Sequence, residues 1–138
     1  MRPLTLLLLG LLVAGCDSGP ETVDHTAMGG TWAWVSSTDV ETGEVHTPET
    51  EGYDARLVFT PDDGVSGSYR YERVGGEPRT VEGRYAVGFE NAPGRDFVVI
   101  DTPIDFLDET AWLSRGSEVL RLGGVFELGY TTLYARVR

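Results

Sequence analysis

VSGSYRYERV, residues 65–74, and TVEGRYAV, residues 80–87, are the two runs that decide the fold of this chain. In each run apolar residues or glycine alternate with polar and charged residues, the period of a β-strand with one buried face. Residues 75–78 (GGEP) between them carry a turn signal, so the two runs predict an antiparallel hairpin. Gly67 and Gly83 lie inside the strand patterns, where we expect them to bend the strands and curl the sheet.

Further runs of strand type lie on both sides of this hairpin. They cover residues 31–37, 55–60, 96–101, 111–114, 118–122 and a last stretch from about 125 to 137. About eight strands joined mostly by tight turns are typical of a meander, and an eight-stranded meander closes into a barrel that leaves no exposed edge. We therefore predict an all-β domain over residues 30–138, an antiparallel up-and-down barrel. Residues 38–54 and 102–110 are expected to be polar loops, the first covering one end of the fold and the second containing a short helical turn.

The first fifteen residues form a segment of a different kind. A positive charge at Arg2 precedes an apolar run over residues 4–14, which is shorter than the roughly 20 residues that a membrane-spanning helix needs. Small residues follow, and this order predicts a secretory signal peptide over residues 1–15. Residues 16–29 are rich in acidic and small polar residues, so we expect a flexible tether between the signal and the barrel.

The end of this signal, residues 12–16 (LVAGC), resembles the lipobox of bacterial lipoproteins. The resemblance implies cleavage before Cys16, a thioether-linked lipid on its sulfur and fatty acylation (palmitate) of the new amine. It further implies an exported protein anchored to a bacterial membrane, with its body in the periplasm or at the cell surface; which membrane is left open. Two or more acyl chains hold a protein stably on a membrane. Cys16 is the only cysteine, so no disulfide within the chain is expected.

The charge of the chain is strongly negative. It has 22 acidic residues against 11 basic ones, a net charge of −11, and every basic residue is arginine. Such a chain is not expected to bind nucleic acid, because phosphate binding needs a basic patch. Two compatible explanations stay open for this composition: a GC-rich coding sequence with a solvated acidic surface, or adaptation to high salt.

The first and last strands carry a second resemblance. Gly30-Thr31-Trp32 at the first strand and Arg136 near the end resemble the pattern of the lipocalins and the wider calycin group. The resemblance implies that Trp32 closes one end of the barrel and that Arg136 packs across its ring, both in structural roles. Residues 57–69 (LVFTPDDGVSGSY) are similar to the strand, Asp-Gly turn and strand of small bacterial lipocalin-like domains.

The sequence contains no catalytic or metal-binding pattern, so we predict no enzyme activity, no cofactor and no metal. His25 and His46 lack partners at the spacing of metal ligands. Four acidic residues lie in or next to the predicted loop 102–110; they are Asp101, Asp105, Asp108 and Glu109. Such a cluster could bind calcium or could be a solvated loop, and the solvated loop is favoured. Neither a Gly-x-Ser-x-Gly elbow nor a glycine-rich phosphate loop occurs.

The barrel interior is the remaining candidate site. An eight-stranded barrel is filled by its own side chains or holds one small ligand. The candidate ligand contacts are the inward aromatic residues Trp34, Phe59, Tyr69, Tyr71 and Tyr85. Two functions follow: a membrane-anchored barrel that binds a small apolar or amphipathic molecule, or a filled barrel that displays loops such as 38–54 to a protein partner of unknown identity.

Overall fold

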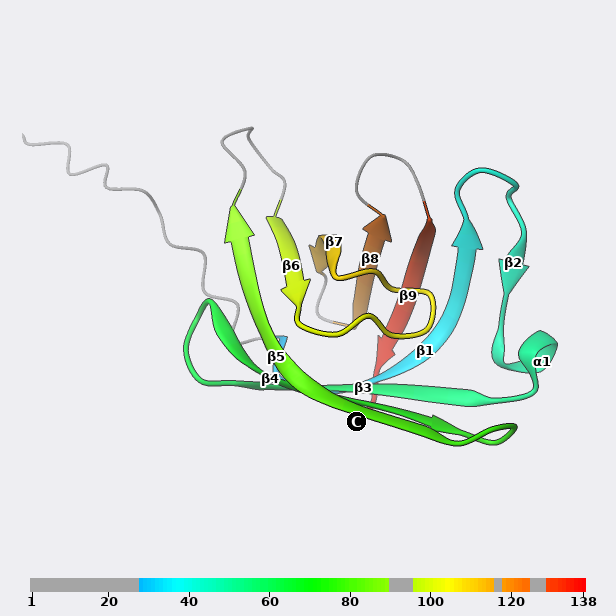
Figure 1. Cartoon of the computed structure of the whole chain (residues 1–138), viewed down its shortest axis with the longest axis horizontal. Helices are drawn as coiled ribbons and strands as arrows, with labels where there is room; N and C mark the ends of the chain where they lie inside the picture. The colour runs from blue at the N-terminus through cyan, green and yellow to red at the C-terminus, as the bar shows by residue number, and fades with distance from the viewer. Residues whose placement is uncertain (1–27, 90–95, 116–117, 125–128) are drawn as a thin grey trace, which may run out of the picture.

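Residues with strand-type alternation form one antiparallel sheet that curls and closes on itself (Figure 1). The computed structural model describes residues 28–89, 96–115, 118–124 and 129–138. Its elements are β1 (Gly30–Asp39), β2 (Val45–His46), α1 (Pro48–Glu51), β3 (Asp54–Pro61), β4 (Ser66–Val74), β5 (Arg79–Phe89), β6 (Asp96–Ile100), β7 (Thr110–Arg115), β8 (Val119–Gly124) and β9 (Tyr130–Arg136).

The eight strands β1 and β3 to β9 make a closed barrel, which confirms the predicted fold class. Each strand pairs with the next in sequence, and the pairing of β1 with β9 closes the ring. The strand β2 is additional. It pairs with residues 37–38 of β1, after β3 has left that edge at residue 33, and so covers backbone groups that would otherwise lack partners.

The alternation of β1 changes phase at a bulge. Its register on β9 slips between Trp34 and Ser36, which leaves Val35 as an extra residue facing outward. Because a one-residue shift moves the following side chains to the other face, Ser37 points into the barrel. This bulge places a hydroxyl, rather than an apolar group, at a fully buried position.

The predicted loop 38–54 is in fact structured. The strand β1 extends to Asp39, and β2 and the short helix α1 follow within the predicted loop. Thr47 caps α1, since its side chain accepts from Thr50 N while the Thr50 hydroxyl accepts from Thr47 N. Gly52 ends the helix in the left-handed conformation with φ 74°.

The packed body begins two residues before the predicted boundary. Met28, placed in the tether by the sequence, has 0% of its surface exposed. Val65, predicted to face inward, is 40% exposed and lies in the turn before β4. The signal segment, Cys16 and the rest of the tether up to residue 27 lie outside the described residues. Where the chain is described, no helix is long and apolar enough to cross a membrane.

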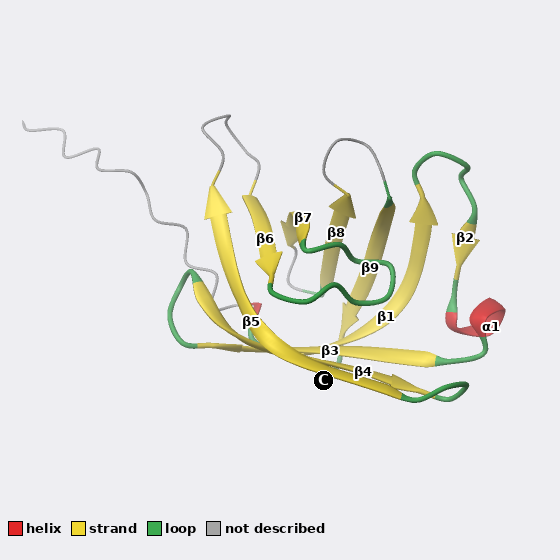
Figure 2. Ribbon diagram, in the orientation of Figure 1, coloured by secondary structure: helices red, strands yellow, loops and turns green. Residues whose placement is uncertain are grey.

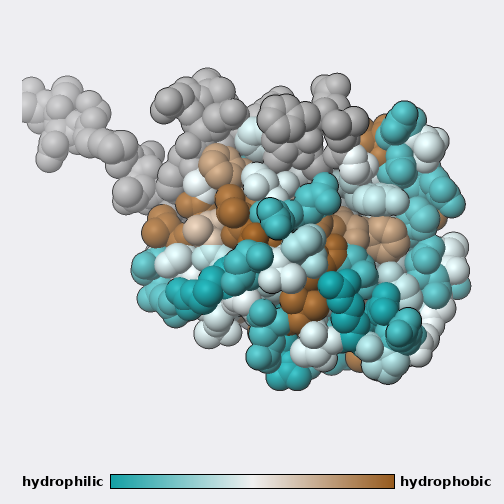
Figure 3. All heavy atoms as spheres, in the orientation of Figure 1, coloured by the Kyte–Doolittle hydropathy of each residue, from teal (hydrophilic) through white to brown (hydrophobic). Residues whose placement is uncertain are grey.

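The outward face of β3 to β5 carries charged side chains. Arg70 lies 2.6 Å from Glu72 and 3.7 Å from Glu82, and all three side chains are at least one-third exposed. Exposed pairs of this kind add little stability. On the face drawn in Figure 3, hydrophilic residues follow the lower edge where β4 and β5 run, and hydrophobic residues show through nearer the centre.

Candidate functional site

A connecting segment, residues 101–109, folds across one end of the barrel and is called the inner segment here. It joins β6 to β7 and runs in front of β8 and β9 toward β1 (Figures 1 and 2). Ile104 and Leu107 are 5% and 6% exposed and exchange two backbone hydrogen bonds, Ile104 N to Leu107 O at 3.1 Å and Leu107 N to Ile104 O at 2.9 Å. The predicted helical turn is therefore wrong, because this pairing is an isolated β-bridge. Between them, Phe106 adopts a φ of 58°, an uncommon backbone conformation for a residue other than glycine.

The structure brings the five predicted interior residues together inside the barrel. Trp34, Phe59, Tyr69, Tyr71 and Tyr85 are each at most 5% exposed. Phe59 and Tyr85 meet edge to face, with their ring centroids 4.9 Å apart. Burial, followed by the hydrogen bond to an aspartate, raises the pKa of Tyr69 and the pKa of Tyr71. Both phenols are therefore held in the neutral form.

Asp105 of the inner segment lies between two arginines. Its Oδ1 lies 2.9 Å from Arg79 Nη1, and its Oδ2 lies 3.1 Å from Arg73 Nη1. Tyr71 donates its phenol hydrogen to Oδ2 at 2.9 Å. Arg73 and Arg79 are direct partners in the register of β4 and β5, and two like charges in such a pair repel each other. The carboxylate between them removes that repulsion.

A second aspartate fixes the start of the inner segment. Asp101 Oδ1 accepts from the Tyr69 phenol at 3.2 Å, and its Oδ2 accepts from Arg84 N at 3.0 Å. This carboxylate sits where a side chain at Gly83 would be, because a Cβ at that position would lie 1.9 Å from Asp101 Oδ1. Gly83 is therefore required for close approach of the inner segment. The expectation of a solvated acidic loop agrees with the exposure of Asp101, Asp108 and Glu109, although Asp101 also bonds to the barrel wall. It is wrong for Asp105, whose side chain is only 20% exposed and pairs with two arginines.

Four rings lie face to face in a column at this end of the barrel. In order they are Tyr53, Trp34, Phe106 and His46, with successive centroid separations of 5.4, 5.5 and 4.9 Å. The first two and the last belong to the barrel wall or to elements packed on it, whereas Phe106 comes from the inner segment. Arg73 lies over Tyr53 at 5.0 Å, and Tyr130 meets the Phe106 ring edge to face at 5.0 Å. Such contacts are worth about 0.5–1.5 kcal/mol each beyond their burial.

A chain of hydrogen bonds links Trp34 to the backbone of Phe106 through the barrel wall. Trp34 Nε1 donates to Ser37 Oγ at 2.9 Å, and Ser37 Oγ lies 2.9 Å from Thr132 Oγ1. Thr132 Oγ1 donates to the carbonyl oxygen of Phe106 at 2.9 Å. Because the Thr132 hydrogen is used on this carbonyl, Ser37 must be the donor to Thr132. Every bond in the chain then points from Trp34 toward the inner segment.

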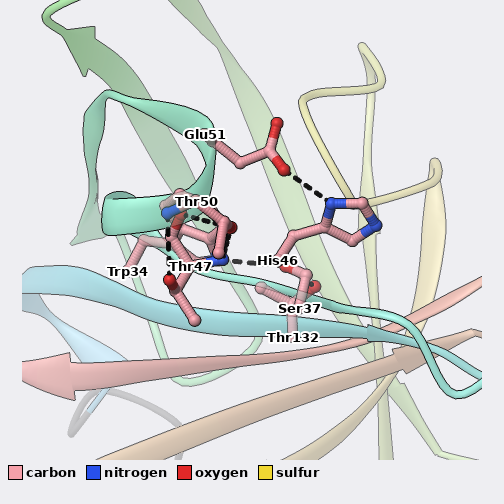
Figure 4. Close-up of polar contacts among 7 residues, drawn as sticks. All are labelled: Trp34, Ser37, His46, Thr47, Thr50, Glu51 and Thr132. Carbon is pink, nitrogen blue, oxygen red and sulfur yellow. Dashed lines mark hydrogen bonds and ion pairs between the residues drawn. The ribbon is translucent and has the colours of Figure 1, made fainter.

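The helix α1 positions the outer ring of the column (Figure 4). His46 Nδ1 lies 2.7 Å from Glu51 Oε1 at the end of α1. An ionised carboxylate only accepts hydrogen bonds, so Nδ1 carries the hydrogen. The capped helix therefore orients the His46 ring against Phe106, which gives the predicted loop 38–54 a local role that the sequence did not indicate.

Tyr134 is a buried tyrosine whose phenol feels the charge of Asp105. This residue of β9 is 1% exposed, and among the described residues no hydrogen-bond partner reaches its phenol. Burial raises the pKa of the Tyr134 phenol, and the nearby charge of Asp105 raises it further. A buried phenol with no partner among the described residues is uncommon, because most buried polar groups are hydrogen-bonded.

The opposite end of the barrel carries the residues of the second family resemblance. Arg136 Cζ lies 4.1 Å from the Trp32 ring centroid, and Arg136 Nη1 donates to Gly29 O at 3.0 Å. Trp32 Nε1 donates to Met28 O at 2.8 Å. Gly30 has a φ of 116°, and a Cβ there would lie 3.2 Å from the guanidinium. Glycine at the first position of Gly-x-Trp therefore has a steric reason.

Sequence reasoning missed the polar half of the site. Ser37, Thr132, Arg73 and Arg79 were not predicted as site residues, although the alternation of β4 placed the neighbouring Tyr71 correctly. The predicted turn 75–78 would have placed Arg73 opposite Thr80, two residues from the turn on either side, so the pairing of Arg73 with Arg79 follows only from the register in the structure. Over the described ranges, no group of three or more histidine, cysteine or acidic residues is placed to hold a metal ion.

Comparisons with known proteins add little. No protein-family model matches the chain. No curated protein matches it either. A solved structure of a de novo designed fluorescence-activating β-barrel is similar, with 17% identity over 79% of this chain and 93% of the designed chain, and a TM-score of 0.43.

Proposed function

We propose that this protein is an exported lipoprotein, anchored to a bacterial membrane through Cys16, whose lipocalin-like barrel binds a small amphipathic molecule. The lipobox-like residues 12–16 support the anchor. The stacking of Arg136 on Trp32 supports the lipocalin-like reading, since the resemblance implies that contact. In this proposal the ligand binds at the end of the barrel that contains Asp105.

The aromatic column is the observation that carries ligand binding. Trp34 and His46 are fixed by other parts of the protein, through Ser37 and Glu51 respectively. The ring that fills the interval between them belongs to a connecting segment. A pair of fixed aromatic faces, with polar groups beside them, is the kind of lining that small-molecule sites have.

The filled barrel is the second candidate, and the same segment favours it. Asp101 and Asp105 engage the phenols of Tyr69 and Tyr71, and the carbonyl of Phe106 engages Thr132. In this alternative the inner segment is a permanent part of the core, and the protein acts by presenting its outer surface to a partner.

Native mass spectrometry of the protein purified from its own host tests the ligand. We expect a bound small molecule in at least part of the population, and a uniformly empty protein would favour the filled barrel. The mature mass tests the anchor separately. It should correspond to a chain beginning at Cys16 with diacylglycerol and an acyl chain, and Cys16→Ser should remove the lipid; an unmodified Cys16 would refute the anchor while leaving the barrel function open.

A further inference from the structure

We propose that the seat now occupied by Asp105 and Phe106 is a binding site for aromatic carboxylates, and that the inner segment imitates such a ligand. The inference rests on the proposed ligand-binding function and names its ligand class. Two neighbouring residues of the segment present a carboxylate, an aromatic ring and a carbonyl oxygen to the barrel. Each of the three meets a partner of matching chemistry.

The residues that bind the Asp105 carboxylate all belong to the barrel wall and form an anion site. Arg73 and Arg79 oppose each other across β4 and β5, so the wall carries two positive charges that need a counter-ion. Tyr71 already donates to the present carboxylate. Planar guanidinium groups match the geometry of carboxylates, which favours this anion class.

The ring partners limit the ligand to a flat aromatic group. The Phe106 ring is nearly parallel to Trp34, at an interplanar angle of 17°, and lies at 28° to His46. A ring between two aromatic faces must be planar to keep both contacts. Thr132 donates to the Phe106 carbonyl, so an acceptor atom on the ligand would find a donor there.

The backbone conformation of Phe106 indicates that side-chain contacts hold the inner segment in its place. Its φ of 58° lies in the left-handed region, which costs energy for a residue with a side chain. The contacts of Asp105 and the ring must offset that cost. A free ligand that makes the same contacts would release it.

The experiment compares 2-naphthoate with its neutral amide, 2-naphthamide, by calorimetry. In Asp105→Ala/Phe106→Gly, which removes both imitating groups, we expect the acid to bind roughly ten- to hundredfold more tightly than the amide. The matched control Asp108→Ala/Phe106→Gly makes the same charge change at an exposed position of the segment. There, and in Phe106→Gly alone, the preference should reverse, because Asp105 still occupies the arginines and repels a second carboxylate. The single variant also serves if the double variant does not fold.

The unmodified protein gives the decisive reading. Millimolar 2-naphthoate should speed hydrogen exchange at the backbone N–H groups of Ile104 and Leu107, because these residues lose their mutual hydrogen bonds when the segment is displaced. 2-Naphthamide at the same concentration should not change these exchange rates. Equal binding of acid and amide to the double variant would overturn the ligand class and leave the proposed function standing. Binding to variants without any displacement in the unmodified protein would overturn the inference, since the segment would then be permanent core. No binding of either probe to any form would overturn the inference, and an empty protein from the host would count separately against the proposed function.

Discussion

Thr132→Val should loosen the inner segment, because the chain of hydrogen bonds from Trp34 to Phe106 passes through this hydroxyl. Valine has nearly the shape of threonine, so the change removes the polar group without a large cavity. Two bonds of 2.9 Å disappear, one to Ser37 and one to the Phe106 carbonyl. At about 1 kcal/mol for each bond and more for a buried group left unpaired, the free energy of unfolding should fall by about 2–3 kcal/mol.

Ser37→Ala allows the magnitude to be checked by a double-mutant cycle. It also removes two bonds, and one of them is the bond already lost in Thr132→Val. The double variant therefore loses three bonds rather than four, and its loss should be about 1 kcal/mol smaller than the sum of the single losses. Urea denaturation followed by tryptophan fluorescence measures all three variants.

Thr60→Val is the matched control, because Thr60 is exposed on β3 and should tolerate the change within about 0.5 kcal/mol. Hydrogen exchange adds a local measurement. Relative to the unmodified protein, Thr132→Val should speed exchange at the amides of Ile104 and Leu107 more than at the amides of the barrel strands. If Thr132→Val were as stable as Thr60→Val, or if the two buried substitutions were additive, the directed chain of bonds would be refuted.

Three more predictions concern other parts of the barrel. Arg136→Lys should cost about 2 kcal/mol, because lysine cannot stack flat on Trp32, and thermal unfolding against Arg138→Lys would show it; equal melting temperatures would contradict the stacking role. Gly83→Ala should displace Asp101 and lower the urea midpoint, whereas Ala86→Gly on the same strand should change it less; a silent Gly83→Ala would disprove the close approach. Five of the six tyrosines have a raised pKa, chiefly through burial; they are Tyr53, Tyr69, Tyr71, Tyr85 and Tyr134. The fold favours their neutral form, so their contribution to the free energy of unfolding is complete below about pH 10 and is lost as the pH rises further. Phenolate absorbance that appeared at a pH well below that of unfolding would contradict this expectation.

The strands were predictable because each carries its own evidence. The alternation in residues 65–74 and 80–87 reports one buried face, and β4 and β5 form with Tyr69, Tyr71 and Tyr85 inside. The number of strands then favours closure, which the pairing of β1 with β9 completes. These are properties of short stretches of chain, and one sequence is enough to read them.

The path of the inner segment was not predictable in the same way. Residues 101–109 are acidic and lack alternation, so by composition they belong in solvent. The middle of the segment nevertheless packs against the barrel, with Ile104 and Leu107 buried. It is held there because Asp105 meets two arginines from a hairpin more than twenty residues earlier, and because Phe106 meets Trp34 from the first strand. Neither partner is visible from the segment itself.

For this protein, the sequence alone determined an eight-stranded antiparallel barrel, the inward aromatic faces and the expectation of a lipid anchor at Cys16. Those conclusions depend on periodicity and on motifs that are local in the chain. Only the tertiary structure decided what the inward faces contact, because the bulge at Val35 turned Ser37 inward and the closed barrel brought β1, β4, β5 and β9 around one connecting segment. Charge and hydrogen-bond complementarity between distant residues, rather than hydrophobic pattern, determines how that end of the barrel is filled.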